Sequence, residues 1–354
     1  MPRTPLRRTV SDLGEFTLLN TVQQILADCN APSPHGIGDD AAILQPSSGH
    51  EWLVSKDLLL EGIHFDSQYA TYREIGYKAA AVNISDMAAM GGTPQYLLIG
   101  LAVPPSTPLA HVRALYRGLR DICRTFRITV IGGDTCASRT DVCISITIIG
   151  TVKAGHALCR NGAQVGDHIY VTGTLGDSGA GLRLLQDRTS RYTGQLPKSV
   201  VRFLIQRHLH PTPQVHLGQI LAKRRLATAA IDLSDGLSGD LRHLCQASHV
   251  GADIEMSNIP ISSQCAAYIS YSHDSRMKIS LASGEDYQLL FTVSPNNQQR
   301  LKHMATRLGY MITRIGTIQP SKQGLHIQLA DGARQALPQQ SYDHFRSSSV
   351  QARL

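Results

Sequence analysis

Strand-like and helix-like segments alternate along both halves of this 354-residue chain, and this alternation limits the possible fold more than any other feature. A polar stretch, KAGHALCRNGAQVGD, separates the two halves. Such mixing on both sides of a polar stretch predicts an α/β (α+β) protein with two domains that meet near residue 155. The strand-length apolar runs of the first half are Glu51–Lys56, Tyr96–Val103, Ile128–Ile131 and Val142–Val152.

Capping signals locate the helices of the first half. Thr71 and Glu74 have the spacing of a capping box, in which each side chain can bond the other's backbone amide at the first turn. The helix that begins there is expected to stop at Gly91–Gly92, since glycine commonly ends helices. A second helix is expected over Leu109–Phe126, where apolar residues recur at helical spacing.

The second half is expected to open with a strand at His168–Thr172, a glycine-rich turn and a helix over Asp177–Gln186. The turn reads GTLGDSGAGL and does not fit GxGxxG, so its glycines predict tight packing of a helix on a sheet rather than a phosphate cradle. Later come a strand at Ala229–Leu233, a helix from about Leu237 and a strand at Tyr287–Val293.

Composition argues against several classes of protein. No run approaches the ~20 apolar residues of a membrane-spanning helix, and the basic N-terminus, residues 1–13, reads as a mobile extension because no apolar stretch follows it. The seven cysteines form no CxxC pair, which indicates reduced thiols and a cytoplasmic protein. The net charge of +7 is scattered and aromatic residues make up only 5%, which favours a small anionic substrate over nucleic acid.

Aspartates recur beside glycine or serine near strand-like runs, in GIGDDAAIL, LVSKDLLL, VIGGDTCAS and AIDLSDGL. A further aspartate, Asp86, lies three residues from Asn83 on one face of the first helix. Taken singly, such an aspartate more often ends a strand or caps a helix. Taken together, clustered carboxylates repel one another unless cations lie between them, and hard oxygen ligands suit magnesium with bound phosphates. The set therefore predicts a metal–nucleotide site.

The chain has no P-loop sequence GxxxxGK[ST] and no HRD or DFG element of protein kinases. Instead, eight segments resemble the thiamine-monophosphate kinase pattern within the aminoimidazole-ribonucleotide-synthetase-like superfamily, and they occur in one order over nearly the whole chain. They are GEFTLL (Gly14–Leu19), GIGDDAAIL (Gly36–Leu44), EGIHF (Glu61–Phe65), AVNISDMAAMGG (Ala81–Gly92), IGGDT (Ile131–Thr135), GDHIYVTGTLGDSGAGL (Gly166–Leu182), AIDLSDGL (Ala230–Leu237) and SGEDYQLLFTV (Ser283–Val293).

The resemblance implies a fold and an activity. The fold would combine an N-terminal ferredoxin-like-type sheet domain, residues 14–154, with a C-terminal α/β domain, residues 155–354, that completes the active cleft. The N-terminal domain would bind ATP and magnesium and form a homodimer. The reaction would be direct, magnesium-dependent transfer of the ATP γ-phosphate to thiamine monophosphate, with no covalent phospho-enzyme.

The resemblance also implies roles for particular residues. Magnesium would be held by Asp40, Ser55, Lys56, Asp57, Asp86, Asp134, Asp232 and Asp235. ATP would contact Gly133, Asp134, Arg160 and Ser234, and thiamine monophosphate would contact His64, Glu285 and Gln339. No side chain is assigned as a catalytic acid or base, because the acceptor phosphate is already an anion.

Two positions depart from the family pattern. Lys56 stands where threonine is usual. A backbone carbonyl ligand would be unaffected by this change, whereas an ammonium group among the ligands would weaken or replace one magnesium ion. Gln339 stands where tryptophan is usual, which removes a flat aromatic partner for the rings of the substrate.

Two alternatives stay open. The chain could be a non-catalytic or differently specific nucleotide-binding member of the same superfamily. It could also be a basic nucleic-acid-binding protein, whose affinity would fall steeply with salt. His208 and His210 flank one leucine and are interpreted as surface side chains, because no third metal ligand is evident beside them.

Overall fold

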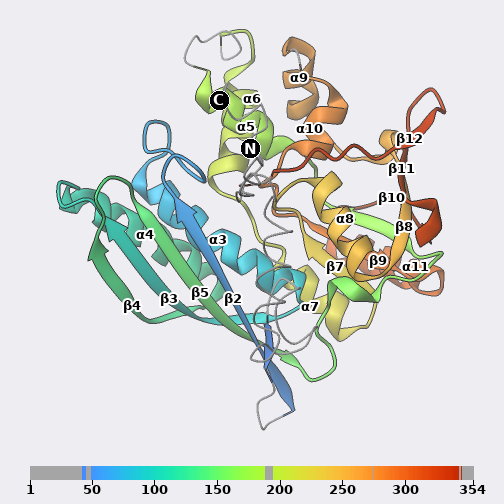
Figure 1. Ribbon diagram of the computed structural model, residues 1–354, viewed down its shortest axis with the longest axis horizontal. Coiled ribbons are helices and arrows are strands. Elements are labelled where there is room, and N and C mark those ends of the chain that lie inside the picture. Colours follow the sequence, from blue (N-terminus) through green and yellow to red (C-terminus); the bar gives the residue numbers. More distant parts are fainter. Residues whose placement is uncertain (1–41, 45–48, 188–193, 273, 343, 345–354) are drawn as a thin grey trace, which may run out of the picture.

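Figure 1 shows the computed structural model, which describes residues 42–44, 49–187, 194–272, 274–342 and 344. The predicted extension at 1–13, the GEFTLL segment and Asp40 lie outside these residues. Each half of the described chain contributes one mixed sheet with helices packed against it. The predicted α/β (α+β) class is therefore confirmed.

The first sheet has five strands in the order β1-β2-β5-β3-β4. β3 and β4 are parallel, and the other neighbours are antiparallel. Along β2 the side chains alternate between a buried inner face, with Leu53 and Leu59, and an outer face with the exposed Lys56 and Leu58. The bounds are Ala42–Leu44 (β1), His50–Leu60 (β2), Thr93–Val103 (β3), Thr129–Ala137 (β4) and Cys143–Lys153 (β5).

Two long helices, α3 (Tyr72–Ala89) and α4 (Leu109–Phe126), belong to this half. The predicted capping box of α3 is present, because Thr71 and Glu74 each accept a bond from the other's backbone amide. The two helices approach closely at a glycine, since a β-carbon at Gly118 would lie 2.8 Å from the backbone nitrogen of Tyr77. This contact holds α4 against α3, which itself packs on the sheet.

The second sheet has seven strands in the order β12-β11-β8-β10-β6-β9-β7. Only the β8–β11 pair among these strands is parallel. β6 has its predicted bounds, whereas β7 ends at Asp232 and β9 begins at Leu289, slightly inside the predicted ranges. The bounds are His168–Thr172 (β6), Ala229–Asp232 (β7), Val250–Glu255 (β8), Leu289–Val293 (β9), Ile312–Pro320 (β10), Leu325–Gln328 (β11) and Arg334–Ala336 (β12).

The helices of the second half surround this sheet (Figure 1). The glycine-rich segment before and within α5 serves close packing, since a β-carbon at Gly181 would lie 2.7 Å from the carbonyl carbon of Leu204 on α6. None of the described helices is long and apolar enough to cross a membrane. The bounds are Asp177–Gln186 (α5), Lys198–Leu209 (α6), Val215–Lys223 (α7), Leu237–Ala247 (α8), Ser263–Tyr271 (α9), Arg276–Ala282 (α10) and Gln298–Leu308 (α11).

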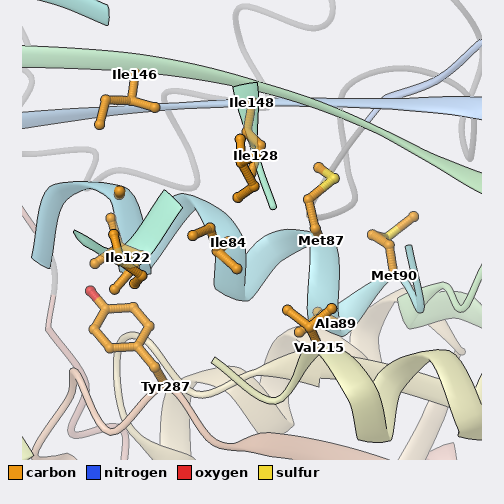
Figure 2. Packing of buried hydrophobic residues seen from close by; sticks show 14 of the residues in the cluster. Ile84, Met87, Ala89, Met90, Ile122, Ile128, Ile146, Ile148, Val215 and Tyr287 are labelled. Atoms are coloured by element: carbon orange, nitrogen blue, oxygen red, sulfur yellow. The ribbon is translucent and has the colours of Figure 1, made fainter. Parts of the chain in front are cut away.

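Helix α3 lies between the two halves, and Figure 2 shows its surroundings. Ile84 and Met87 of α3 lie between the inner face of the first sheet and Val215 of α7, and all of them belong to one buried cluster. Tyr287, from the loop before β9, joins the same cluster. Because one continuous core spans both halves, the side chains of α3 are placed against residues from each of them.

Candidate functional site

Helix α3 brings together predicted metal ligands from the first half. The Ser55 hydroxyl on β2 donates a 2.5 Å hydrogen bond to Oδ2 of Asp86 on α3. Two residues further along β2, the backbone amide of Asp57 donates a 3.3 Å hydrogen bond to Oδ1 of Asn83 on α3. Ser55, Asp57 and Asp86 are all half-buried. Because β2 continues to Leu60, Asp57 lies within the strand rather than after it.

Another face of α3 meets the aspartates of the second half. Ser85 Oγ donates to Oδ2 of Asp232 at 2.6 Å, and both residues are buried. In the following loop, the amides of Asp235 and Gly236 donate to Oδ2 of buried Asp240 at 3.2 and 3.1 Å. Burial, followed by the Asp235 and Asp232 carboxylates, raises the pKa of Asp240 well above its usual value. Asp232 at the end of β7, Asp235 in the loop and Asp240 on α8 therefore affect one another electrostatically.

Tyr287 lies where the two groups of aspartates meet. Burial raises the pKa of its hydroxyl well above the usual value, and Glu285, Asp57, Asp232 and Asp235 add to the rise in that order. Asp57 belongs to the first half, whereas the other carboxylates belong to the second. Both halves thus contribute negative charge to the surroundings of one buried side chain.

The oxygen groups around α3 fit a magnesium site that is completed by substrate oxygens. Among the described residues, no three His, Cys, Asp or Glu side chains lie close enough to hold an ion by themselves. Magnesium in nucleotide enzymes commonly takes one or two carboxylates together with phosphate oxygens and water. The hydroxyl and carboxylate pairs Ser55–Asp86 and Ser85–Asp232 offer that chemistry.

The Lys56 side chain lies on the opposite face of β2 from the Ser55 side chain. Its Nζ donates to Ser145 Oγ at 2.6 Å on the outer face of the sheet. Ser55 reaches α3 on the inner face, and successive side chains of a strand alternate between faces. A metal ion beside Ser55 could therefore meet the backbone carbonyl of Lys56, but not its ammonium group.

Two glycines allow β4 to lie close against β3. Gly132 and Gly133 have φ values of 158° and 153°, and a β-carbon at Gly133 would lie 2.7 Å from the carbonyl carbon of Ile99. A surface hollow of about 310 Å³ lies beside these residues and is lined also by Tyr116 of α4. The predicted nucleotide contact Gly133 thus borders an open hollow at the edge of the sheet.

Asp134 follows Gly133 but is far from Asp57 in the same chain. In the strand register, Asp134 of β4 lies opposite Gly100 of β3. Gly100 lies opposite Ser145 of β5, and Ser145 lies opposite Leu58 of β2. Three strand spacings of about 4.8 Å put roughly 14 Å between Asp134 and β2. Paired residues share a face, so Asp134 lies on the outer face while Asp57 lies on the inner one. The described chain therefore does not bring these two predicted ligands together.

The predicted nucleotide contacts Arg160 and Ser234 belong to the surroundings of Asp232 and Asp235. Ser234 lies between these two aspartates, in the loop after β7. Arg160 lies in the short 3-10 helix Arg160–Gly162, where its carbonyl accepts a 2.6 Å bond from Ser248 Oγ. Its guanidinium acts to lower the pKa of Asp240, but burial and the Asp235 and Asp232 carboxylates raise that pKa by more. The carbonyl of Ser234 accepts the amide of Glu285 at 2.7 Å. This bond joins the predicted metal loop to a predicted acceptor contact.

The predicted acceptor contact His64 is neutral near physiological pH. Its Nδ1 accepts the amide of Leu60 at 3.0 Å, and its ring centroid lies 4.8 Å from that of His344. Burial, followed by His344, lowers the pKa of His64 to about 4, although nearby Glu285 acts to raise it. Gln339 is exposed and directly follows Pro338, whose carbonyl accepts a bond from Ser238 of α8.

Two residues that the sequence did not assign to the site, Lys78 and His208, contact Glu285. Lys78 of α3 forms a 2.7 Å ion pair with Glu285 Oε1, and His208 Nδ1 lies 3.4 Å from Oε2. The prediction that His208 is a surface side chain is wrong, because it is 2% exposed in the core between α6 and α3. The partners of His208, which are Lys78, Ser178 and Glu285, come from distant parts of the chain, and no local pattern reveals them. The sequence did offer a signal for Lys78, because three alanines follow it directly and a lysine in such an apolar stretch indicates a buried charge.

Family models match both halves. The description "AIR synthase related protein, N-terminal domain" covers residues 38–152, and "AIR synthase related protein, C-terminal domain" covers residues 164–327. The Thiamine-monophosphate kinase of Bacillus subtilis is 35% identical over 88% of this chain and 93% of its own length. That of Escherichia coli K12 is 38% identical over 94% of this chain and 98% of its own length.

The chain belongs to the thiamine-monophosphate kinase family. A solved structure described as "AaThiL complexed with AMPPCP and TMP" has a TM-score of 0.82 and 31% identity, and it covers 96% of this chain and 100% of its own. The predicted family and two-domain fold are therefore confirmed. The domain limits and the roles assigned to single residues stay predictions.

Proposed function

We propose that this chain is a thiamine-monophosphate kinase, which transfers the γ-phosphate of ATP to thiamine monophosphate and releases thiamine diphosphate and ADP. Its similarity to enzymes of that name over almost their whole length carries the proposal. The AaThiL complex supports it further, because AMPPCP is an ATP analogue and TMP is the acceptor. Donor and acceptor of the proposed reaction are thus bound together in a protein with this fold.

The proposed magnesium ligands are oxygen groups on both sides of α3. When bound there, magnesium would neutralise the phosphates and align them for in-line transfer. The chain's own contribution is orientation, since Ser55 and Ser85 each fix one carboxylate by a short hydrogen bond. The proposed set is Ser55, the carbonyl of Lys56, Asp57, Asp86, Asp232 and Asp235, with Asp40 outside the described residues.

The spacing of contacts along α3 supports a direction in which the acceptor would lie along this helix. Lys78, which bonds Glu285, and Ser85, which bonds Asp232, are seven residues apart, or about 10 Å along one helix face. The acceptor's rings would lie near Glu285 and His64, and its phosphate near Asp232. Gln339 would contact the rings from the side of α8. Arg160 and Ser234, at the loop after β7, would contact ATP.

We also propose that the enzyme is a cytoplasmic homodimer in which Asp134 acts on the partner's site. Within one chain Asp134 and Asp57 lie on opposite faces of the sheet, roughly 14 Å apart across three strands. The edge strand β4 exposes Val130 and Ile131, which are 46% and 52% accessible, and such an edge favours association with another chain.

The reaction is tested by incubating the purified protein with ATP, magnesium and thiamine monophosphate and following thiamine diphosphate by chromatography. Product is expected only when ATP and magnesium are both present. Asp57→Asn and Asp86→Asn are expected to lower turnover by about 100-fold or more with an unchanged melting temperature, whereas Asp331→Asn, on an exposed turn, should behave as wild type. A folded wild type that binds ATP but forms no diphosphate would favour the non-catalytic alternative.

Shared sites are tested by co-expressing Asp57→Asn and Asp134→Asn chains, each inactive alone. If Asp134 serves the partner, a mixed dimer has one site with both defects and one intact site. Half of randomly formed dimers are mixed, so activity should recover to about a quarter of wild type. If Asp134 serves its own chain, every site carries a defect and the mixture stays inactive.

A further inference from the structure

Lys78 is a buried cation that reaches neither the predicted metal ligands nor solvent. Its side chain is 4% exposed, and Nζ lies 2.7 Å from Glu285 Oε1 and 3.3 Å from His208 Nε2. The residue comes from α3 of the first half, whereas Glu285 and His208 come from the second. A buried ammonium group is retained only where its charge is paired, and here Glu285 supplies the negative charge.

The contacts of Lys78 determine which nitrogen of His208 carries its proton. An ammonium group can only donate, so Nε2 of His208 is the acceptor and Nδ1 bears the hydrogen. Nδ1 lies 3.0 Å from Ser178 Oγ and 3.4 Å from Glu285 Oε2. Burial, followed by Lys78, lowers the pKa of His208 to about 3, so the ring is neutral. Glu285 therefore has the Lys78 ammonium beside one oxygen, whereas its other oxygen lies near the neutral His208 ring, whose Nδ1 has Ser178 Oγ as its closer partner.

The backbone around Glu285 is held in an unfavourable conformation. Glu285 and Tyr287 have φ values of 65° and 47°, which residues with a β-carbon rarely adopt. The amide of Glu285 donates to Ser234 at 2.7 Å and that of Tyr287 donates to Leu233 at 2.9 Å. Between them, Asp286 accepts the amides at the start of α5. Strain that the surroundings enforce in this way is a mark of a functional position.

The Glu285 carboxylate remains partly accessible, with 26% of its side chain exposed. Burial is the largest single effect and acts to raise its pKa, but Lys78, His208 and His64 together outweigh burial, so the pKa is lowered. The Glu285 charge also opposes the lowering of the pKa of His64 and, after burial, raises the pKa of Tyr69, so these two side chains lie near it. An ionised carboxylate in a partly open position, beside aromatic groups, suits a cationic ring system.

We propose that Lys78 and His208 are positioning residues that hold the Glu285 carboxylate ionised and correctly oriented for the positively charged rings of the acceptor. The inference rests on the proposed function. Lys78 and His208 would act only through Glu285, so they would set the affinity for the acceptor and leave the binding of ATP unchanged. A merely structural ion pair would instead affect stability without distinguishing the two substrates.

The test is a double-mutant cycle with Lys78→Met, Glu285→Gln and the combined variant. Lys78→Met is expected to raise the KM for thiamine monophosphate by about 10-fold or more, with less than about a 2-fold change in the KM for ATP. In the Glu285→Gln background, Lys78→Met should have almost no further effect, because the group through which it acts is already neutral. Lys223→Met, an exposed lysine of α7, is the matched control and should change nothing.

Three results would overturn the proposal. The first is an unchanged KM for the acceptor in folded Lys78→Met, and the second is an equal rise in the KM values for the acceptor and ATP. The third is a combined variant in which the rise in the acceptor KM equals the product of the two single rises. If Lys78→Met does not fold, the same cycle is run with His208→Leu, which removes the Nδ1 atom near Glu285 without leaving a buried carboxylate unpaired. An inactive wild type would reject the proposed function itself. An active wild type with uncoupled residues would reject only the positioning role.

Discussion

Replacing Gly218 with alanine tests whether the close approach of α7 to α3 holds the proposed metal-binding side chains in place. A β-carbon at Gly218 would lie 3.0 Å from the carbonyl carbon of Ala88, 3.4 Å from its α-carbon, and closer still to its carbonyl oxygen. Carbon atoms in ordinary contact are about 3.5–4.0 Å apart. Because the obstacle is backbone rather than a flexible side chain, α7 has to move away from α3.

The magnitude follows from the kind of obstacle. Overpacking typically costs about 1–3 kcal/mol, and a backbone clash belongs at the upper end, near 3 kcal/mol. At about 2 °C per kcal/mol for a chain of this size, the melting temperature should fall by roughly 6 °C. Ala88 lies two residues after Asp86 and three after Ser85, so displacement of this turn should also lower kcat. Thermal unfolding and the thiamine diphosphate assay measure the two effects.

Gly309→Ala is the control for this substitution. Gly309 ends α11 with φ of 72°, and no atom lies within 4 Å of its would-be β-carbon. The variant should lose only about 1–2 kcal/mol through backbone strain, and its kcat should not change. A Gly218→Ala protein with wild-type melting temperature and wild-type kcat would refute the close approach of the two helices.

Three further predictions are simpler. Thr71→Ala removes the capping box of α3 and should lower stability by about 1 kcal/mol in thermal unfolding, with kcat retained because the first turn is remote from Asp86. His208 has a folded pKa of about 3 against an ordinary value of 6.5, so the neutral ring stabilises the fold fully above pH 6.5 and this contribution is lost as the pH falls. The melting temperature of His208→Asn should therefore drop less than that of wild type between pH 6.5 and 4, and equal drops would contradict the assignment. Gly133→Ala places a β-carbon 2.7 Å from the carbonyl carbon of Ile99, so it should displace β4 and raise the KM for ATP more than that for the acceptor, as steady-state kinetics would show.

Elements with strong local signals were predictable from the sequence. The capping box of Thr71 and Glu74 marks the start of α3, and the bounds of α4 are those that helical spacing indicates. β4 was harder, since it was expected only over Ile128–Ile131 but runs over Thr129–Ala137. Its two glycines follow directly on that apolar run, and next to β3 they adopt an extended conformation that only glycine tolerates well.

The candidate site was predictable only in part, because its members differ in how local their signals are. Aspartates beside glycine and serine stand out in the sequence, and Ser55 and Asp86 do lie within one hydrogen bond of each other. Lys78 and His208 are 130 residues apart, and each resembles an ordinary helical residue until the helices are packed together. Their relation to Glu285 depends on tertiary structure, which a local pattern cannot report.

The position of Lys56 shows why a lysine is compatible with the proposed activity. Strand alternation directs Ser55 toward α3 and Lys56 toward Ser145 on the outer face, so the change from threonine leaves the inner carboxylates untouched. The added charge lies instead on the face that carries Asp134, beside which we place the partner subunit. A lysine there would lie at the proposed contact with the partner subunit. Lys56→Thr should therefore leave the magnesium dependence of kcat unchanged and weaken dimerisation, measured by sedimentation; a shifted magnesium dependence would mean that the ammonium group reaches the metal site after all.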